Sequence, residues 1–200
     1  MIISVRKENR AQQRSPRVAR RRKRMRNALK SAGARQFSGK GVAAVTVEDL
    51  INEADISRAT FYEFYSSKYN LLESILNPIF IFAIDSISSC ISLPPEDALS
   101  GLFETYLLLW RKHREGLLLI PTVDPSSVSN FREQHDALSM AILRLLTLAE
   151  NSDLLRNGSA QYSLKIIART AIPLLRVYDG HPAADELFRD AMRALLVKSY

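Results

Sequence analysis

Apolar side chains recur along most of this chain at steps of three and four residues, which is the spacing of one face of an α-helix. In residues 46–55, for example, Val47, Leu50, Ile51 and Ala54 follow this spacing. The alternation of apolar and polar residues that is typical of strands is absent, and the 200 residues include only 7 Gly and 8 Pro. The pattern therefore predicts an all-α protein of about nine helices.

Caps and helix breakers set the expected bounds of these helices. Pro78 lies inside the fourth helix and is expected to kink it, since its ring removes an N–H donor and clashes one turn back. Gly39 and Gly41 are expected to end the first helix. The predicted helices span about 20–37, 47–54, 58–65, 68–89, 95–113, a short segment after Gly116, 126–150, 159–178 and 182–199.

Residues 46–72, TVEDLINEADISRATFYEFYSSKYNLL, contain two short helices joined by a tight turn and followed by a third helix. Thr46 and Ser57 are suited to cap the two short helices, because their hydroxyls accept bonds from N–H groups of the first turn. Asp55 tolerates the left-handed conformation that ends a helix, although Gly adopts it at lower cost. Phe61 is expected to be buried. This layout is the one that places a recognition helix in the major groove of DNA.

The same segment resembles the DNA-binding domain of the tetracycline-repressor (TetR) family of bacterial transcription regulators. Residues 37–50, FSGKGVAAVTVEDL, are similar to the family's F-x-x-x-G-x-x-x-x-T-hydrophobic pattern. The following ADISRATFYEFYSSKYNLL is similar to its A-G-hydrophobic-S-x-x-T-hydrophobic-Y-x-x-F-x-x-K-x-x-L-L pattern. The chain departs from the family at Asp55, where Gly is usual, and at the adjacent Phe64 and Tyr65, where one aromatic residue is typical.

The resemblance implies roles for several polar residues. Thr60 and Tyr62 would face bases and phosphates, Lys68 would contact a phosphate, and Thr46 and Ser57 would act as backbone-contacting caps. Arg58 has the chemistry to bind guanine through two hydrogen bonds. The alternative is that these are ordinary surface or capping residues. The candidate DNA-binding residues are Thr46, Ser57, Arg58, Ala59, Thr60, Tyr62 and Lys68.

Positive charge is concentrated at the start of the chain. The whole sequence has 28 Lys and Arg against 21 Asp and Glu, a net charge of +7. Residues 1–45 hold 14 of the basic residues and the single acidic residue Glu8, whereas 46–70 holds Arg58 and Lys68 against five carboxylates. We interpret the basic cluster at 20–26 as a phosphate-binding surface that supplies much of the electrostatic affinity. A solvated tail, a nonspecific nucleic-acid arm or a patch for anionic membranes are the alternatives.

The resemblance also implies a C-terminal domain that binds an effector and forms dimers. We expect a 1–19 disordered basic arm, a 20–67 helix-turn-helix domain and a 68–200 effector-binding and dimerisation domain. An apolar cavity in the last domain suits a small hydrophobic or aromatic effector, although plain core packing is the alternative for each residue. Candidate effector-binding residues are Phe103, Tyr106, Leu107, Trp110, Phe131, His135, Leu138 and Ile142.

The last two predicted helices carry wide apolar stripes. The family resemblance favours a homodimer interface for these stripes. The alternative is that they pack within one monomer. The stripes are Ile166, Ile167, Thr170, Ala171, Leu174, Leu175 and Tyr178 on one helix, and Leu187, Phe188, Ala191, Met192, Leu195 and Leu196 on the other. A twofold dimer would present two recognition helices and would read a palindrome in double-stranded DNA.

Other classes of protein are less well supported by the sequence. The single Cys90 excludes an internal disulfide framework and fits a reducing cytoplasm. No signal peptide is evident, and the apolar stretch 78–93 is too short to span a bilayer. No catalytic residues, cofactor or metal site are expected, since the three His residues are widely separated. The sequence therefore predicts a ligand-responsive regulator, with repression the commoner outcome in the family. A helical interaction module whose Arg-rich arm binds nucleic acid or membrane nonspecifically is the alternative.

Overall fold

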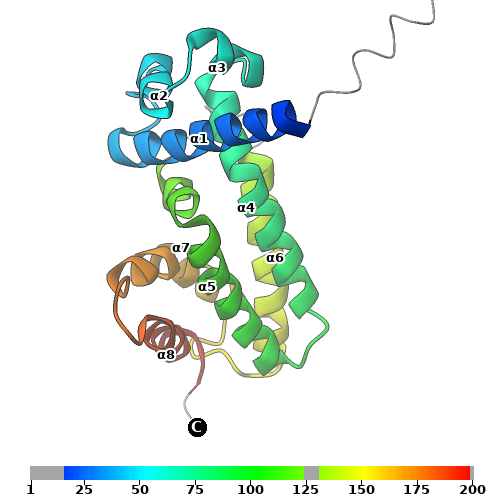
Figure 1. The fold of residues 1–200 in the computed structure, drawn as a ribbon. Helices are drawn as coiled ribbons and strands as arrows, with labels where there is room; N and C mark the ends of the chain where they lie inside the picture. Colours follow the sequence, from blue (N-terminus) through cyan, green and yellow to red (C-terminus); the bar gives the residue numbers. More distant parts are fainter. Residues whose placement is uncertain (1–15, 124–130, 199–200) are drawn as a thin grey trace, which may run out of the picture. The chain divides into compact units, whose positions relative to one another are not determined.

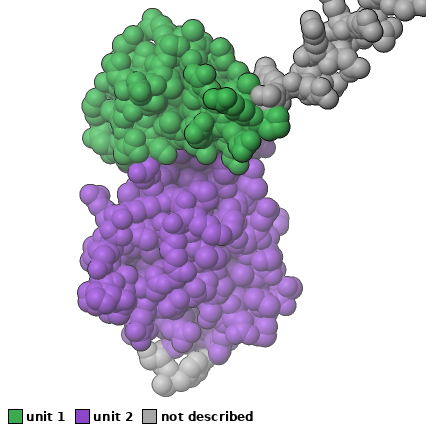
Figure 2. Space-filling view, in the orientation of Figure 1, with its two compact units in different colours: residues 1–72 green, residues 73–200 purple. Residues whose placement is uncertain are grey.

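The computed structural model describes residues 16–123 and 131–198. The chain divides into two compact units, of which unit 1 ends at Leu72 and unit 2 begins at Glu73 (Figure 2). The boundary lies one turn inside the helix that starts at Lys68, whereas the sequence placed it directly before that helix. Most of the predicted basic arm, and the predicted start of the helix at 126–130, lie outside the described residues.

Unit 1 is built from three helices and the first turn of a fourth. The helices are α1 (Pro16–Lys40), α2 (Val47–Ala54), α3 (Arg58–Phe64) and α4 (Lys68–Cys90). α1 lies across α2, and α2 packs on α3 (Figure 1). The core of unit 1 is formed by side chains that are fully buried, namely Leu29, Ala32, Phe37, Val45, Leu50, Phe61, Leu71 and Leu72.

α1 is longer than predicted at both ends. It begins at Pro16 rather than near residue 20, and proline suits the first turn because its missing N–H would have no partner there. It ends at Lys40, where Gly41 takes the left-handed conformation with φ +80° and donates its N–H to the carbonyl of Phe37 at 3.0 Å. Gly39 remains inside the helix, because its backbone needs no positive φ.

Unit 2 is also helical. It consists of the rest of α4 followed by α5 (Pro95–Leu119), the 3-10 turn η2 (Ile120–Thr122), α6 (Phe131–Asn151), α7 (Ala160–Val177) and α8 (Ala184–Leu196). α5 contacts α6, α7 and α8. One isolated bridge joins Leu155 to Val197. The all-α prediction is confirmed, with eight α-helices over the described residues against about nine expected. The difference arises because the short segment after Gly116 continues α5.

Helical backbone geometry is interrupted within α5 rather than within α4, where the sequence predicted a kink. α4 continues through Pro78 as one helix, whereas His113 interrupts the helical backbone of α5 with φ −140° and ψ 30°. α4 has 23 residues, and an 18-residue window within it has a mean hydropathy of 1.5, so it is long and apolar enough to cross a membrane by length and composition. Five of its apolar side chains lie in the core, since Leu76, Ile79, Phe80, Ala83 and Ile87 are buried.

The apolar stripes of α7 and α8 divide between the core and the surface. The buried members are Ile167, Ala171, Leu175, Phe188, Met192 and Leu196. The members that keep accessible surface are Ile166, Thr170, Leu174, Tyr178, Leu187, Ala191 and Leu195. Each helix therefore has one apolar side that is buried in unit 2 and a second apolar side that keeps some accessible surface.

Candidate nucleic-acid interface and effector cavity

The start of α2 is fixed by a reciprocal pair of hydrogen bonds. The Thr46 hydroxyl accepts the backbone N–H of Asp49 at 3.1 Å, and the Asp49 carboxylate accepts the Thr46 N–H at 2.8 Å. The hydroxyl of Thr46 also donates to this carboxylate at 2.6 Å, and Lys40 lies 3.0 Å from it. Donation by Thr46, aided by Lys40, holds the pKa of Asp49 well below its ordinary value. This capping box confirms Thr46 as the N-cap.

The turn between α2 and α3 is a tight left-handed connection. Asp55 has φ 51° and ψ 54°, and the N–H of Ile56 donates to the carbonyl of Ile51 at 3.1 Å. Ser57 then caps α3, because its hydroxyl accepts the N–H of Thr60 at 3.1 Å. Phe61 is fully buried and anchors the seven-residue helix in unit 1. These contacts set the direction of α3 as it leaves the turn.

The N-terminal half of α3 presents its side chains outward, as predicted. Arg58, Ala59 and Tyr62 are exposed, and Tyr62 keeps 52% of its surface accessible. Thr60 is half-buried, and its hydroxyl lies 2.9 Å from that of Ser57. The guanidinium of Arg58 lies 2.6 Å from the carboxylate of Glu48. Both groups are exposed, so this ion pair contributes little and can exchange for a stronger partner.

Lys68 has a structural role in unit 1. Its ammonium donates to the carbonyls of Ala43 at 2.9 Å and Val45 at 2.7 Å, which ties the α1–α2 loop to the first turn of α4. An ammonium has three N–H donors, so one remains after these two bonds. The predicted phosphate contact of Lys68 is compatible with this geometry and stays a prediction.

Ion pairs offset most of the acidic charge of the helix-turn-helix. Four of its five carboxylates are paired with a cation, and three of the four cations come from α1. The pairs are Glu48–Arg58, Asp49–Lys40, Glu53–Arg35 and Glu63–Arg22. The guanidinium of Arg35 donates to Glu53 and lowers the pKa of that carboxyl. Asp55 forms no ion pair within the described residues. The electrostatic role that the sequence assigned to the first helix is therefore partly internal to unit 1.

Two sets of polar residues on α1 have different surroundings, although sequence reasoning treated their cations as one cluster. Arg22 and Arg26 stack on the ring of Phe64 at 4.8 and 5.3 Å, and Arg22 also pairs with Glu63 at 2.9 Å. This set holds the C-terminal end of α3. The other set is exposed and lines a surface hollow, with Arg17, Arg20, Lys23, Arg24 and Asn27. The two sets occupy different faces of α1, and the spacing of their residues along the sequence is the signal that distinguishes them.

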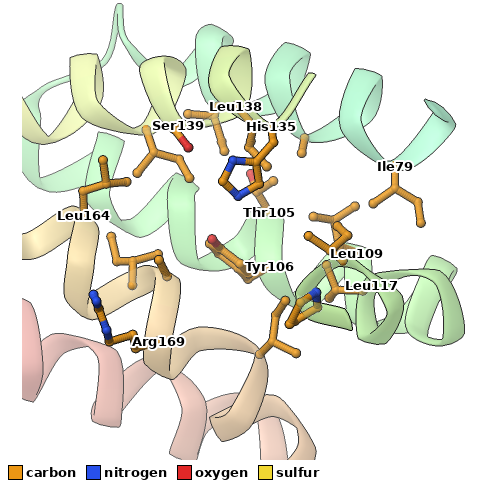
Figure 3. Close-up of a pocket in the computed structure, with 18 of the residues that line it drawn as sticks. Ile79, Thr105, Tyr106, Leu109, Leu117, His135, Leu138, Ser139, Leu164 and Arg169 are labelled. Carbon is orange, nitrogen blue, oxygen red and sulfur yellow. The ribbon is translucent and has the colours of Figure 1, made fainter. Parts of the chain in front are cut away.

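Unit 2 contains a largely apolar cavity of about 340 Å³, partly open to solvent, between α4, α5, α6 and α7 (Figure 3). Four of the eight predicted effector-binding residues line it, namely Tyr106, His135, Leu138 and Ile142. Burial raises the pKa of Tyr106 above its ordinary value, so its hydroxyl stays protonated. The cavity therefore has the volume and lining of a site for a small apolar ligand.

The other four predicted residues do not border this cavity. Phe103 and Leu107 are buried on the adjacent side of α5, and Trp110 donates its indole N–H to Asp179 at 3.2 Å. Phe131 packs edge-on against Phe80, with 5.6 Å between the ring centres. Residues three and four apart share a helix face. The sequence placed the cavity beside the face of α5 that carries residues 103, 107 and 110. The structure places it beside residues 105, 106 and 109.

Sequence reasoning missed the contribution of α7 to the cavity. Lys165 and Arg169 line it together with the apolar residues at 164, 168 and 172, and Thr105 and Ser139 add hydroxyl groups from α5 and α6. The three- and four-residue spacing of 164, 168 and 172 was visible in the sequence. Sequence reasoning assigned only the neighbouring stripe of this helix, which shares Ile167 with the cavity lining, and periodicity does not say which neighbour a face meets.

Comparison with known proteins supports the reading of unit 1. Residues 29–75 match the family described as "Bacterial regulatory proteins, tetR family". The matched segment covers the second half of α1, all of α2 and α3, and the start of α4. No curated protein matches the chain in sequence.

Several solved structures have the same fold along nearly their whole length. The ketosteroid transcriptional regulator KstR2 of Mycobacterium tuberculosis aligns with a TM-score of 0.74 and 16% identity, over 87% of this chain and 95% of that one. NalD, the secondary repressor of the MexAB-OprM multidrug efflux pump in Pseudomonas aeruginosa, aligns at 0.60 and 19%, over 90% and 100%. The SmeT–triclosan complex aligns at 0.58 and 19%, over 88% and 92%. SmeT is named the repressor of the Stenotrophomonas maltophilia multidrug efflux pump SmeDEF.

Proposed function

We propose that this chain, whose residues 29–75 match the tetR family of bacterial regulatory proteins, is a ligand-responsive transcriptional repressor of that family. In this proposal a homodimer binds a palindromic operator, and a small apolar effector releases it. The observation that carries the proposal is the exposed N-terminal half of α3, which follows a capped left-handed turn in the same unit as the exposed cations of α1.

Unit 1 is the proposed DNA-binding domain. Thr60 and Tyr62 contact bases and phosphates, Arg58 leaves Glu48 to bind guanine, and the exposed cations of α1 contact the phosphates beside the site. A charge-assisted contact between arginine and guanine discriminates against other bases by about 1–3 kcal/mol. The phosphate contacts add affinity without sequence preference and weaken as salt rises.

Unit 2 is the proposed effector-binding and dimerisation domain. The sides of α7 and α8 that carry Ile166, Leu174 and Leu195 are apolar and accessible in the described chain, and Val177 keeps 74% of its surface exposed. We propose that a second copy of this chain buries these surfaces, because a twofold interface buries the same apolar patch on both chains. Such a dimer carries two copies of α3 and therefore reads two half-sites.

The effector acts through the cavity of unit 2. A ligand can release DNA only if it binds the released conformation more tightly than the DNA-bound one. α4 belongs to unit 1 in its first turn and to unit 2 thereafter, so we propose that it carries the change, with Pro78 weakening the helix at the point of bending. If Pro78→Ala leaves the effect of the ligand on DNA affinity unchanged, α4 is not bent there.

The proposal is tested by selecting genomic DNA fragments with the purified full-length protein at moderate salt and again at higher salt. A single enriched palindrome that resists competitor DNA is expected. Enrichment without a motif that collapses as salt rises would support the nonspecific helical module instead.

Two variants connect the selected DNA to α3. Tyr62→Ala and Arg58→Ala should each lower operator affinity about tenfold while leaving affinity for unrelated DNA less changed. Arg144→Ala is the matched control, since Arg144 is an exposed arginine on α6 of unit 2. Equal losses from Arg58→Ala and Arg144→Ala would contradict the placement of α3 on the operator.

A further inference from the structure

Several polar groups around the cavity of unit 2 lie on one side of it, whereas Thr105 and His135 lie nearer its middle (Figure 3). In Figure 3, Ser139 and Arg169 lie on the same side, and the hydroxyl of Tyr106 points toward that side. The opposite side is bordered by the apolar residues Ile79, Leu109 and Leu117, which come from α4 and α5 (Figure 3). A ligand that fits this cavity therefore has one polar end and one apolar end.

The charged groups among the described lining residues are all basic. Lys165 and Arg169 lie one turn apart on α7, and the part of the lining that the structure describes includes no Asp or Glu. Neither cation forms an ion pair within residues 16–123 and 131–198. One guanidinium nitrogen of Arg169 donates to the backbone carbonyl of Lys165 at 3.1 Å, which leaves its other N–H donors available. The polar side of the cavity thus carries positive charge that no described carboxylate offsets.

The Tyr106 hydroxyl adds a neutral donor to the same side. It lies deep in unit 2 and keeps accessible surface because it borders the cavity. No group of the described residues forms a hydrogen bond with it. Burial keeps its pKa above the ordinary value, so it can donate a hydrogen bond at neutral pH. A hydroxyl that borders the cavity and has no hydrogen-bond partner among the described residues leaves room for an acceptor that a ligand or water supplies.

We infer that the ligand of this cavity is an amphipathic anion, with an apolar body between α4 and α5 and a carboxylate on the side of α6 and α7. Arg169 and Lys165 bind the carboxylate, and Tyr106 donates to it. This inference rests on the proposed function, because it specifies the effector of the same cavity. A cationic ligand of the same shape meets two like charges and no carboxylate, so it binds most weakly.

The experiment uses the full-length protein and N-phenyl-1-naphthylamine, a neutral apolar dye that fluoresces when it is bound in an apolar site. Decanoate, decanol and decylamine then compete with the dye, since they share a chain length and differ in the charge of the head group. Decanoate should displace the dye at a concentration about tenfold lower than decanol, and decylamine should be the weakest competitor. Added salt should narrow the difference between the concentrations of decanoate and decanol that displace the dye.

Variants assign the preference to residues. Arg169→Gln should lower the affinity for decanoate about fivefold and leave the affinity for decanol unchanged. The contact that is lost is a partly exposed charge-assisted hydrogen bond. Tyr106→Phe should weaken decanoate by a smaller factor while preserving the volume of the ring. Arg176→Gln is the matched control, since Arg176 is an exposed arginine on α7 outside the cavity lining.

The outcomes separate this inference from the proposed function. If the dye binds and decanoate competes no better than decanol, the cavity takes neutral ligands and only the anion is overturned. If Arg176→Gln weakens decanoate as much as Arg169→Gln, the preference reflects the general charge of α7 and the assigned site is wrong. If the dye does not bind, the cavity takes no apolar ligand, and the proposed response to an effector fails together with the inference.

Discussion

The turn between α2 and α3 allows backbone strain and electrostatics to be separated at one position. Asp55 adopts φ 51° and ψ 54°. This left-handed conformation costs an L-residue about 1–2 kcal/mol, less for Asp and Asn, and glycine adopts it without steric cost. Part of that gain is lost, because a glycine makes the unfolded chain more flexible. We therefore expect Asp55→Gly to stabilise unit 1 by about 0.5–1 kcal/mol and Asp55→Ala to destabilise it by about 1 kcal/mol.

The charge of Asp55 affects a different property. The other four carboxylates of the helix-turn-helix are paired with cations, whereas Asp55 has no ion pair within the described residues. Its charge therefore repels DNA phosphates without a nearby cation to offset it. Asp55→Asn removes the charge and keeps a side chain that tolerates the left-handed conformation. It should raise DNA affinity at low salt, with a smaller change in stability than that of Asp55→Gly.

Thermal unfolding of unit 1 and fluorescence anisotropy with the selected operator measure the two properties. For a domain of 60–100 residues, about 1 kcal/mol corresponds to a Tm shift of roughly 4–8 °C. Asp55→Gly should therefore raise Tm by several degrees, and Asp55→Ala should lower it by a similar amount. If glycine is no more stable than alanine at this position, the turn is not left-handed and the geometry of α3 is wrong. If asparagine leaves low-salt affinity unchanged, the turn does not approach DNA.

Further outcomes follow from the caps and from close packing. Thr46→Ala should destabilise unit 1 by about 1 kcal/mol in urea unfolding, since it removes the cap of α2; an unchanged midpoint would show that the cap does not contribute. The pKa of Asp49 is held below its ordinary 3.8, so its contribution to stability is complete above that pH and is lost as pH falls below it. Thr46→Ala should therefore flatten the acid-dependent loss of stability, which urea midpoints across this range would reveal. Gly116→Ala should lower Tm, because the added Cβ meets the end of the Ile79 side chain and costs about 1 kcal/mol. The matched substitution Gly39→Ala should instead raise Tm, since no atom lies within 4 Å of the new Cβ in α1.

The helix-turn-helix could be predicted largely from the sequence because its geometry depends on interactions between residues close in the chain. The hydroxyls of Thr46 and Ser57 each accept a backbone N–H that lies three residues further along the chain. Asp55 ends a helix through its own backbone conformation. Each of these preferences is local, so the sequence expresses it directly. The outward side of α3 follows from the same periodicity that buries Phe61.

The cavity was predicted only in part because it depends on which helices become neighbours. Apolar faces on α5 and α6 could be predicted from the sequence, and Tyr106 and His135 line the cavity as expected. It did not say that Lys165 and Arg169 would join them, since those cations lie far away in the chain. Phe131 and Trp110 have the same chemistry as cavity residues, yet contacts with Phe80 and Asp179 engage them elsewhere.

The sequence by itself determined the all-α class, the helical bounds within a few residues, the capped turn before α3 and the concentration of positive charge in α1. Only the tertiary structure decided which arginines of α1 hold Phe64 and Glu63 and which remain exposed, and which side of α5 and α7 borders the cavity. The physical reason is one of range. Caps and periodicity act over three to four residues, whereas an amphipathic helix can pack either flank of its apolar stripe against several neighbours. The choice among them depends on packing the whole core without voids or unpaired polar groups.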